Sequence, residues 1–386
     1  MKISARESQT LGVLAAVIAT ILAITLRPYH WNSTALFHMD RLTAKEHGVT
    51  SNFIILTVPG YDGEQYYEIA RQMPNILQPS HWQDLQNTPT IAYSYQRFLL
   101  PLFAFLLAFG QDSLLPYSFL IIEILSLIAV CFMMLRRFPK QPLYALALAL
   151  SPAALIGLHF SLAEPLTLAL LTAFLIRFTT RNVLHTQDII LLSLFVLTRE
   201  VNILFIGVLL VYLMTKKRWQ DCFLLIIPFA TFAALHMLIF GIFSEIPFFW
   251  STDKRALPFA SIADILLGHK GFNVYTLSSI ALFFGFVLPA WIWSASNGIK
   301  RNMSLFLPLA SFAFLCLMLV MPDHIWGSIT SIGRVITPVY PLVMLQAAER
   351  DSLFARILAT SILFLGIGIG LSLALIPHPF ILSPIL

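Results

Sequence analysis

Charged residues are scarce in this chain. Asp, Glu, Lys and Arg together make up 11% of its 386 residues, whereas an average soluble domain has about 25%. Apolar runs extend from one end of the chain to the other, which excludes a soluble protein built around one core. The net charge of +5 is spread in small clusters between these runs, which excludes a continuous basic surface for nucleic acid.

Cysteines and the short catalytic motifs are also scarce. The three cysteines, Cys131, Cys222 and Cys316, lie in or beside apolar runs, and none has a partner at metal-ligand spacing. We therefore interpret them as small apolar residues and expect neither a disulfide nor a zinc site. The sequence contains no nucleotide phosphate-binding loop, no GxSxG and no HExxH motif, which argues against the common hydrolase and metalloprotease sites.

Apolar residues are abundant, at 58% of the chain. Because a helix needs ~20 apolar residues to cross the bilayer, the sequence predicts an all-α, polytopic transmembrane bundle of about eleven spans. The predicted spans are 11–27, 114–135, 142–159, 163–179, 185–198, 201–215, 219–243, 276–296, 303–321, 334–349 and 353–376. We expect the whole chain, 1–386, to form a single membrane domain.

The basic residues predict the orientation of this bundle. Cytoplasmic connections of membrane proteins are enriched in Lys and Arg, and every basic cluster falls on one side if the N-terminus is cytoplasmic. An odd number of spans then puts the C-terminus outside. The cytoplasmic clusters are Lys2 and Arg6; Arg136, Arg137 and Lys140; Arg177 and Arg181; Lys216, Lys217 and Arg218; Lys300 and Arg301; and Arg350 and Arg356.

A thirteen-residue apolar segment, Phe98–Gly110, tests this topology. Counted as a span, it would move Lys140 and everything after it to the other side. We predict instead that it is an interfacial helix, because it is too short to span. The first outer loop then covers 28–113, and such long loops are usually functional.

The densest polar cluster of the chain lies in this loop, from Pro59 to Arg71. Pro-Gly ends the strand-like run Phe53–Val58, and Asp62 is placed to cap a helix that continues to Arg71. Tyr66, Ile69 and Ala70 would share one face of that helix and lie on the membrane surface. Asp62 and Glu64 would be ionised at its N-terminus, where they could act as a base or hold a cation. The alternative is a cap with solvated acids.

A second polar element precedes the interfacial helix. Arg97 follows Tyr95 and enters the apolar run that begins at Phe98. A guanidinium at this depth could bind a phosphate through two nitrogen atoms, with the ring of Tyr95 beside it. The alternative is an arginine that extends to ordinary lipid headgroups.

Further polar residues recur at the predicted outer ends of the spans. Charges at membrane depth are costly and are usually paired or functional. Several on one face, opposite the loop that carries Asp62, favour a shared site. They are His159, Glu164, Arg199, Glu200, Asp323, His324 and Arg334.

These motifs together resemble a known superfamily. The first loop resembles that of GT-C glycosyltransferases, closest to bacterial membrane proteins of cell-surface glycopolymer formation, and is also similar to the Trp-Asp-x-x-x-Tyr-x-x-Ile-Ala pattern of GPI mannosyltransferases. Two residues depart from these patterns, since Tyr61 stands in place of Trp and Glu64 in place of an expected Gln. The matching segments are Tyr61-Asp62-Gly63-Glu64-Gln65-Tyr66-Tyr67-x-Ile69-Ala70, Tyr95-Gln96-Arg97, Leu100-Pro101, Ser161-x-x-Glu164-Pro165, Leu197-Thr198-Arg199-Glu200 and Gly333-Arg334-x-x-x-Pro338.

The resemblance implies an enzyme in the bacterial inner membrane. It would move a sugar from a polyprenyl-phosphate donor to a cell-surface glycan or lipid acceptor on the non-cytoplasmic face. Asp62, with Glu64, would be catalytic, and the arginines would stabilise the leaving phosphate. The superfamily includes members with and without a metal, so a divalent cation is left open. The implied phosphate-binding residues are Arg97, Arg199 and Arg334, and the implied substrate-binding residues are Tyr66, Tyr95, Glu164, Glu200 and His324.

Two other functions remain open at this point. A transporter or flippase of a lipid-linked glycan would use the same arginines to bind phosphate. A non-catalytic membrane scaffold in a glycan-assembly complex would need no site at all. The acid-rich first loop favours the enzyme, because transporters typically bind their substrate between broken helices in matching halves, and the sequence shows no such pair.

Overall fold

The computed structural model describes most of the chain. The described residues are 3–46, 53–57, 60–86, 92–244, 279–300, 306–319, 329–375 and 380–382. Asp323 and His324, which the sequence placed near the site, lie outside the described residues. So do Lys2, Val58, Pro59 and Arg301.

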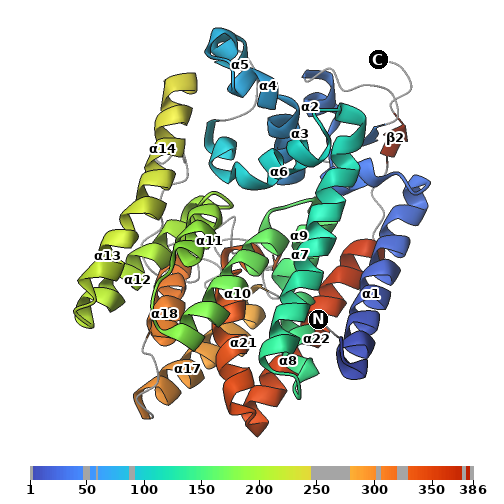
Figure 1. Cartoon of the computed structure of the whole chain (residues 1–386). Coiled ribbons are helices and arrows are strands. Elements are labelled where there is room, and N and C mark those ends of the chain that lie inside the picture. Colours follow the sequence, from blue (N-terminus) through green and yellow to red (C-terminus); the bar gives the residue numbers. More distant parts are fainter. Residues whose placement is uncertain are drawn as a thin grey trace, which may run out of the picture.

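The described part of the chain is almost entirely helical, as predicted (Figure 1). The long helices are α1 (Ala5–Leu26), α7 (Leu115–Arg137), α10 (Glu164–Arg181), α14 (Ile226–Phe243) and α22 (Leu353–Leu375). The shorter bundle helices are α8 (Pro142–Ala149), α9 (Pro152–Phe160), α11 (Thr186–Val196), η6 (Glu200–Asn202), α12 (Ile203–Thr215), α13 (Trp219–Leu224), η8 (Phe283–Val287), α17 (Leu288–Lys300), α18 (Phe306–Leu319), α20 (Ile329–Val335) and α21 (Val339–Arg350).

Six helical segments of the described residues are long and apolar enough to cross a membrane. Each coincides with a predicted span, and the other predicted spans also fall on helices, although these are shorter or carry more charge. The structure therefore supports an all-α membrane protein. The six segments are Ala5–Tyr29, Asp112–Arg137, Pro142–Phe160, Trp219–Phe243, Ser279–Ser296 and Leu353–Leu375.

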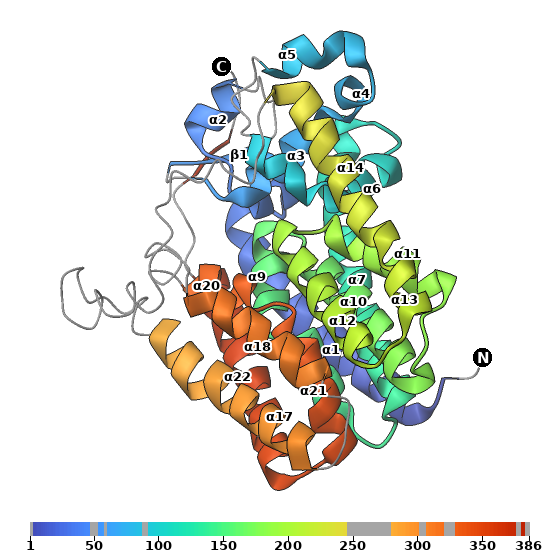
Figure 2. The same ribbon diagram turned by 90° about the vertical axis from the view of Figure 1, so that its left-hand side faces the viewer.

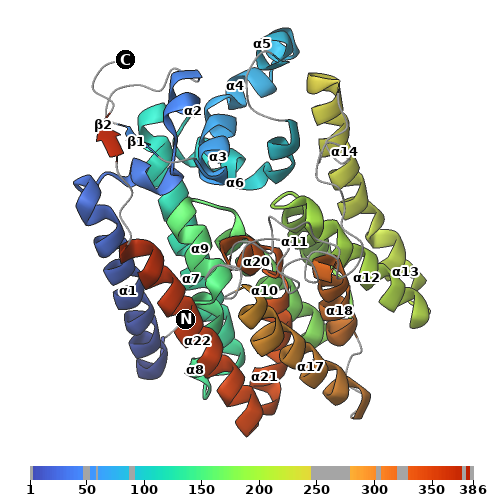
Figure 3. The same cartoon turned by 180° about the vertical axis from the view of Figure 1, so that it is seen from behind.

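The bundle is held together by a continuous apolar core. Helix α7 packs against α10, and α22 packs against both α9 and α1 (Figures 1 and 3). At one point of this core the ring of Phe205 meets those of Phe174 and Phe306 edge to face, with centroids 5.7 and 5.3 Å apart. Edge-to-face contacts are a preferred geometry of aromatic pairs, so these rings fix the packing of α10, α12 and α18.

The first loop forms a cap of short elements at one end of the bundle (Figure 2). Phe98–Gly110 gives the nine-residue helix α6, which at about 1.5 Å per residue cannot cross a bilayer. The elements are η1 (Arg27–Tyr29), η2 (Ser33–Phe37), α2 (Arg41–Glu46), β1 (Ile54–Leu56), α3 (Asp62–Arg71), α4 (Met73–Ile76), η3 (Pro79–His81), α5 (Trp82–Gln86), η4 (Ala92–Arg97), α6 (Leu99–Leu107) and η5 (Asp112–Leu114).

The cap is packed onto the bundle rather than laid on a membrane surface. Tyr66, Ile69 and Ala70 are fully buried, so the predicted membrane-facing side of α3 is wrong. Tyr66 and Ala70 join an apolar cluster with residues of α6, α7 and α9, while Ile69 joins one with α14. Helix α3 has the predicted apolar face, but other helices of the protein cover this face, not the membrane surface.

A small sheet ties the far end of the chain to this cap. Strand β2 (Phe380–Leu382) pairs antiparallel with β1, with Ile55 opposite Ile381. The C-terminal strand therefore lies at the same end of the molecule as the first loop (Figure 1).

Two contacts connect helices at the end of the bundle opposite the cap. Glu7, near the start of α1, forms an ion pair of 3.1 Å with Arg136 at the end of α7. Tyr144 Oη donates a hydrogen bond of 3.0 Å to Asp351, which follows α21. The start of α1 thus shares an end of the bundle with Arg136, away from the cap.

Candidate functional site

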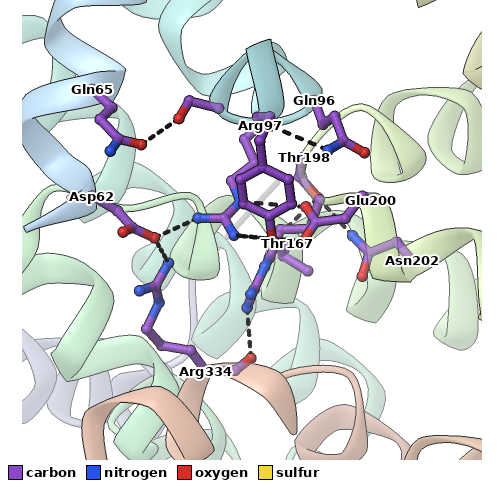
Figure 4. A network of polar contacts seen from close by, with 12 residues as sticks. Asp62, Gln65, Gln96, Arg97, Thr167, Thr198, Glu200, Asn202 and Arg334 are labelled. Atoms are coloured by element: carbon purple, nitrogen blue, oxygen red, sulfur yellow. Dashed lines mark hydrogen bonds and ion pairs between the residues drawn. The ribbon is translucent and has the colours of Figure 1, made fainter. Parts of the chain in front are cut away.

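Six charged side chains from distant parts of the sequence meet where the cap rests on the bundle. Figure 4 labels Asp62, Arg97, Glu200 and Arg334 among them. Five of the six stand at the start or end of a short element or helix. Element termini are where side chains emerge between packed helices, and the site forms where these ends converge. The residues are Asp62, Arg97, Glu164, Arg199, Glu200 and Arg334.

Asp62 links the cap to the bundle. Its Oδ2 accepts hydrogen bonds from Nη1 of Arg97 and, at 2.8 Å, from Nη2 of Arg334. The backbone cap of α3 is Tyr61, and Asp62 is the first helical residue, so the prediction of a capping side chain is wrong. Its carboxylate faces two arginines instead.

The charge state of Asp62 follows from these neighbours. Burial by itself would raise the pKa of the carboxyl group, but the positive charges of Arg334 and Arg97 outweigh that effect. The pKa of Asp62 is held well below its usual range. Asp62 is therefore ionised at neutral pH, and while it is held by both arginines it is a weak base.

Arg97 is enclosed by acidic and phenolic oxygens. Nε lies 3.3 Å from Oε2 of Glu200, and Nη2 donates a bond of 3.0 Å to Oη of Tyr93. Tyr93 in turn donates to Glu200 Oε1 at 2.8 Å, and its ring centroid lies 5.2 Å from the guanidinium carbon. Burial opposes the charge on Arg97, yet the carboxylate of Glu200 raises the pKa of Arg97 well above its ordinary value.

The prediction that Tyr95 accompanies Arg97 is wrong. Tyr95 is buried on the other side of η4, where its ring lies 4.8 Å from that of Phe243 in α14. The tyrosine beside the guanidinium is Tyr93, four residues before Arg97. The sequence carried no signal for this choice, because both tyrosines lie within four residues of Arg97 and the turn of η4 decides which of them faces it.

Arg334 occupies the matching position on the bundle side. Nε donates a bond of 2.7 Å to Oε1 of Glu164, and Nη1 donates one of 3.2 Å to Oη of Tyr61. The guanidinium carbon of Arg334 lies 5.3 Å from the centroid of the Tyr61 ring, and this ring stacks on that of Phe160 with centroids 4.1 Å apart. Tyr61 also donates to Thr330 Oγ1 at 3.2 Å. Arg334 is thus held from three sides.

Glu164 and Arg199 form the buried base of the network. Arg199 Nη1 lies 3.1 Å from Glu164 Oε1, the same oxygen atom that binds Arg334. The Glu164 side chain is fully buried, and those of Arg199 and Arg334 are 6% and 7% exposed. Replacing one residue of such a buried network by an uncharged one leaves a buried charge without its partner, which lowers the free energy of unfolding by about 3–5 kcal/mol.

A glycine allows the cap to approach this closely. A Cβ atom on Gly63 would lie 2.2 Å from the backbone oxygen of Phe160 and 3.1 Å from that of Phe37. Both are backbone atoms, so they cannot rotate away as a side chain could. Any larger residue at position 63 would lift the start of α3, and Asp62 with it, off the end of α9.

Glu64 does not point toward the arginines. Its Oε2 accepts a hydrogen bond of 3.2 Å from the backbone N–H of Asp40, and its carboxylate lies against Gly60. The first turn of α3 directs Asp62 and Glu64 to different neighbours, because residues two apart on a helix do not share a face. Asp62 and Glu64 therefore do not form a carboxylate pair here.

Several buried polar atoms of residues in and beside the network have no hydrogen-bond partner among the described residues. Within the described ranges, Tyr66 Oη, Glu164 Oε2 and Arg199 Nε are buried and have no hydrogen-bond partner. Tyr66 lies close enough to Arg97, Glu164 and Arg334 to feel their charges. Buried polar atoms are nearly always satisfied, so these atoms are available for a ligand with both donors and acceptors.

No group of three or more His, Cys, Asp or Glu side chains that could hold a metal ion is found among the residues that the structure describes.

Searches against protein-family models, curated proteins and solved structures find no match to this chain.

Proposed function

We propose that this protein is a GT-C-type glycosyltransferase of the cell envelope. It moves a sugar from a polyprenyl-phosphate donor to a surface glycan or lipid acceptor on the non-cytoplasmic face of a bacterial inner membrane. The observation that carries the proposal is the convergence of two buried arginines on one partly exposed carboxylate, where a membrane bundle meets its cap.

The site has the parts that this reaction needs. The acceptor hydroxyl oxygen forms a bond to C1 of the sugar while the bond from C1 to the phosphate oxygen breaks, and the electron pair leaves with the phosphate. The hydroxyl proton goes to Asp62. Arg97 and Arg334 stabilise the negative charge that grows on the phosphate, and such preorganised charges are usually the largest contribution to catalysis. The unpartnered atoms of Tyr66, Glu164 and Arg199 would bind sugar hydroxyls.

The fold suits a lipid-linked donor. The network lies where the cap meets the bundle, and apolar side chains remain exposed on the outside of the cap, such as Leu106 and Phe109 of the α6 region, which are 57% and 81% exposed. The donor's polyprenyl chain would stay in the bilayer beside these residues while its phosphate enters the site.

We also propose the full topology of about eleven spans, with the N-terminus in the cytoplasm and the C-terminus outside. The pairing of β1 with β2 supports placing the first loop and the C-terminal strand on one side. The ion pair between Glu7 and Arg136 supports placing the N-terminus and the first basic cluster on the other. Cysteine labelling from outside should modify position 42 and not position 140; labelling of position 140 would reverse the topology.

The decisive experiment measures sugar transfer by purified protein from labelled polyprenyl-phosphate sugars. Product formation with release of polyprenyl phosphate is expected. Asp62→Asn should lower turnover by roughly 10²–10⁴, the usual contribution of a general base. A matched control is Asp351→Asn, because Asp351 is a similarly exposed acid paired with Arg356 at the other end of the molecule. Movement of an intact lipid-linked glycan across a vesicle membrane, without release of polyprenyl phosphate, would identify a flippase instead.

A further inference from the structure

Asp62 is the replaceable member of the charge network. Its side chain is 34% exposed, whereas those of Arg97 and Arg334 are each 7% exposed and that of Glu200 is 10% exposed. If Asp62 turned away, Arg97 would keep Glu200 and Tyr93, and Arg334 would keep Glu164 and Tyr61. Both guanidinium groups would therefore stay in place.

One Asp62 oxygen lies between the guanidinium groups of Arg97 and Arg334, at a point where a phosphate oxygen could accept the same bonds. Oδ2 alone receives N–H groups from both Arg97 and Arg334. A non-bridging phosphate oxygen carries similar negative charge and accepts the same charge-assisted bonds. The two arginines come from the cap and the bundle, so an anion at this point joins the same two parts that Asp62 joins.

The charges of the network match one phosphodiester. Arg97, Arg199 and Arg334 balance Asp62, Glu164 and Glu200, so three positive charges meet three negative ones. Without Asp62 the count is three against two, which leaves one positive charge. A lipid-phosphate sugar is a phosphodiester with one negative charge. Exchange of Asp62 for the donor phosphate keeps the charges around the two arginines balanced, while Asp62 turns to its more exposed side.

We propose that the Asp62 carboxylate occupies the donor's phosphate-binding position between Arg97 and Arg334, and that donor binding displaces it toward the acceptor. The inference rests on the proposed function in taking the donor to be a phosphate ester.

This exchange resolves a conflict in the site. A carboxylate clamped by two arginines is a weak base, and the pKa of Asp62 is held low by both. Once a phosphate neutralises the arginines, Asp62 loses their attraction and its pKa rises toward the ordinary value. The base is thus weak in the empty enzyme and gains strength when the donor is bound, next to the bond that breaks.

Phosphate binding measured without sugar transfer tests the exchange. Affinities are determined in detergent by calorimetry for inorganic phosphate, polyprenyl phosphate and phosphatidylglycerol, with wild type, Asp62→Asn and the control Asp351→Asn. Asp62→Asn removes the carboxylate that competes with phosphate, so phosphate should bind about 10–100-fold more tightly. The apparent affinity is the intrinsic affinity multiplied by the fraction of molecules whose site is open. Asp351→Asn should bind as wild type does. Tighter binding of inorganic phosphate and polyprenyl phosphate alike identifies the phosphate group as the ligand, and a gain confined to phosphatidylglycerol identifies a membrane headgroup site and overturns the donor assignment.

Two further variants complete the test. Arg97→Gln in the Asp62→Asn background should abolish the gain, and persistence of the gain would place the phosphate elsewhere. Asp62→Ser provides the same comparison if Asp62→Asn does not fold. Equal or weaker phosphate binding by the Asp62 variants would show that Asp62 only positions the arginines, which overturns the exchange. If the gain is observed and no sugar is transferred, the exchange stands and the proposed function fails.

Discussion

Arg199 donates a hydrogen bond of 2.8 Å to the backbone carbonyl oxygen of Arg334. The same Nη1 lies 3.1 Å from the Glu164 oxygen that holds the Arg334 side chain. Arg199 therefore binds the main chain and, through Glu164, the side chain of the same residue. Through Nη1, Arg199 therefore positions Arg334, while its Nε stays available for the sugar contact proposed above.

Arg199→Lys should lower kcat by up to about 10²-fold, because small misplacement of a catalytic group has effects of that size. A lysine side chain keeps the charge but is too short to reach both Glu164 Oε1 and the backbone oxygen of Arg334. The phosphate affinity of the Asp62→Asn variant is compared with that of the double variant Asp62→Asn, Arg199→Lys. A lower affinity of the double variant would show that Arg334 has moved. Arg356→Lys serves as control, because Arg356 is 59% exposed in a surface pair. An unchanged kcat would show that Arg199 does not position Arg334 for catalysis.

Arg97→Lys should lose most of the turnover. The Arg97 guanidinium reaches Asp62, Glu200 and Tyr93 at once, and a lysine has neither the planar fork nor the reach to replace these bonds. Arg97→Ala should lose more, and should also unfold more easily by about 3–5 kcal/mol because it leaves buried acids unpaired. Turnover and melting temperature are measured together. Arg41→Lys, at an exposed position in α2 of the same cap, should be nearly neutral.

Gly63→Ala should lower both melting temperature and turnover, because its Cβ would collide with the backbone oxygen of Phe160. Gly207→Ala in α12 is the matched control, since nothing lies within 4 Å of a Cβ there. Alanine in a helix interior is more stable than glycine by about 0.5–1 kcal/mol, so this control should melt at the same or a higher temperature. Two equally tolerated substitutions would mean that the cap does not press on α9 as described.

Tyr93→Phe should flatten the alkaline stability profile. Burial, with the negative charge of Glu200, raises the pKa of Tyr93 from 10.0 to about 12. A raised folded-state pKa gives stability that is fully present below pH 10 and is lost as the pH rises toward 12. The wild-type melting temperature should therefore fall more steeply between pH 10 and 12 than that of Tyr93→Phe. Parallel curves would show that the Tyr93 hydroxyl is not buried against Glu200.

The sequence predicted elements well and their partners poorly. The predicted spans fall on helices because long apolar runs and basic clusters are local signals. Helix α3 was predicted with its end at Arg71, but Asp62 was expected to cap it and is instead its first residue. Its apolar face was assigned to a membrane surface, because periodicity shows that Tyr66 and Ile69 must be covered but not by what. The covering residues belong to α6, α7, α9 and α14, which are distant in the sequence.

The candidate site was predicted in the same uneven way. Charged residues at helix ends within an apolar chain are conspicuous, so Asp62, Arg97 and Arg334 could be named from the sequence. Their pairing could not, since the Asp62 carboxylate meets an arginine 272 residues further along the chain. Tyr93 was missed because two tyrosines precede Arg97, and only the geometry of η4 decides which of them faces it.

The β1–β2 pair sets an order for biosynthesis. The partner of Ile55 in strand β1 is Ile381, which the ribosome makes hundreds of residues later. At the usual ~5–20 residues per second, β1 waits for tens of seconds with an unpaired edge. Such edges can pair with other chains. Arg334 is also made long after the first loop, so the charge network cannot close until α20 has been made. Nascent chains stalled before residue 334 should therefore have an open cap that cannot bind the ligand. A chain truncated before β2 should leave the edge of β1 unpaired.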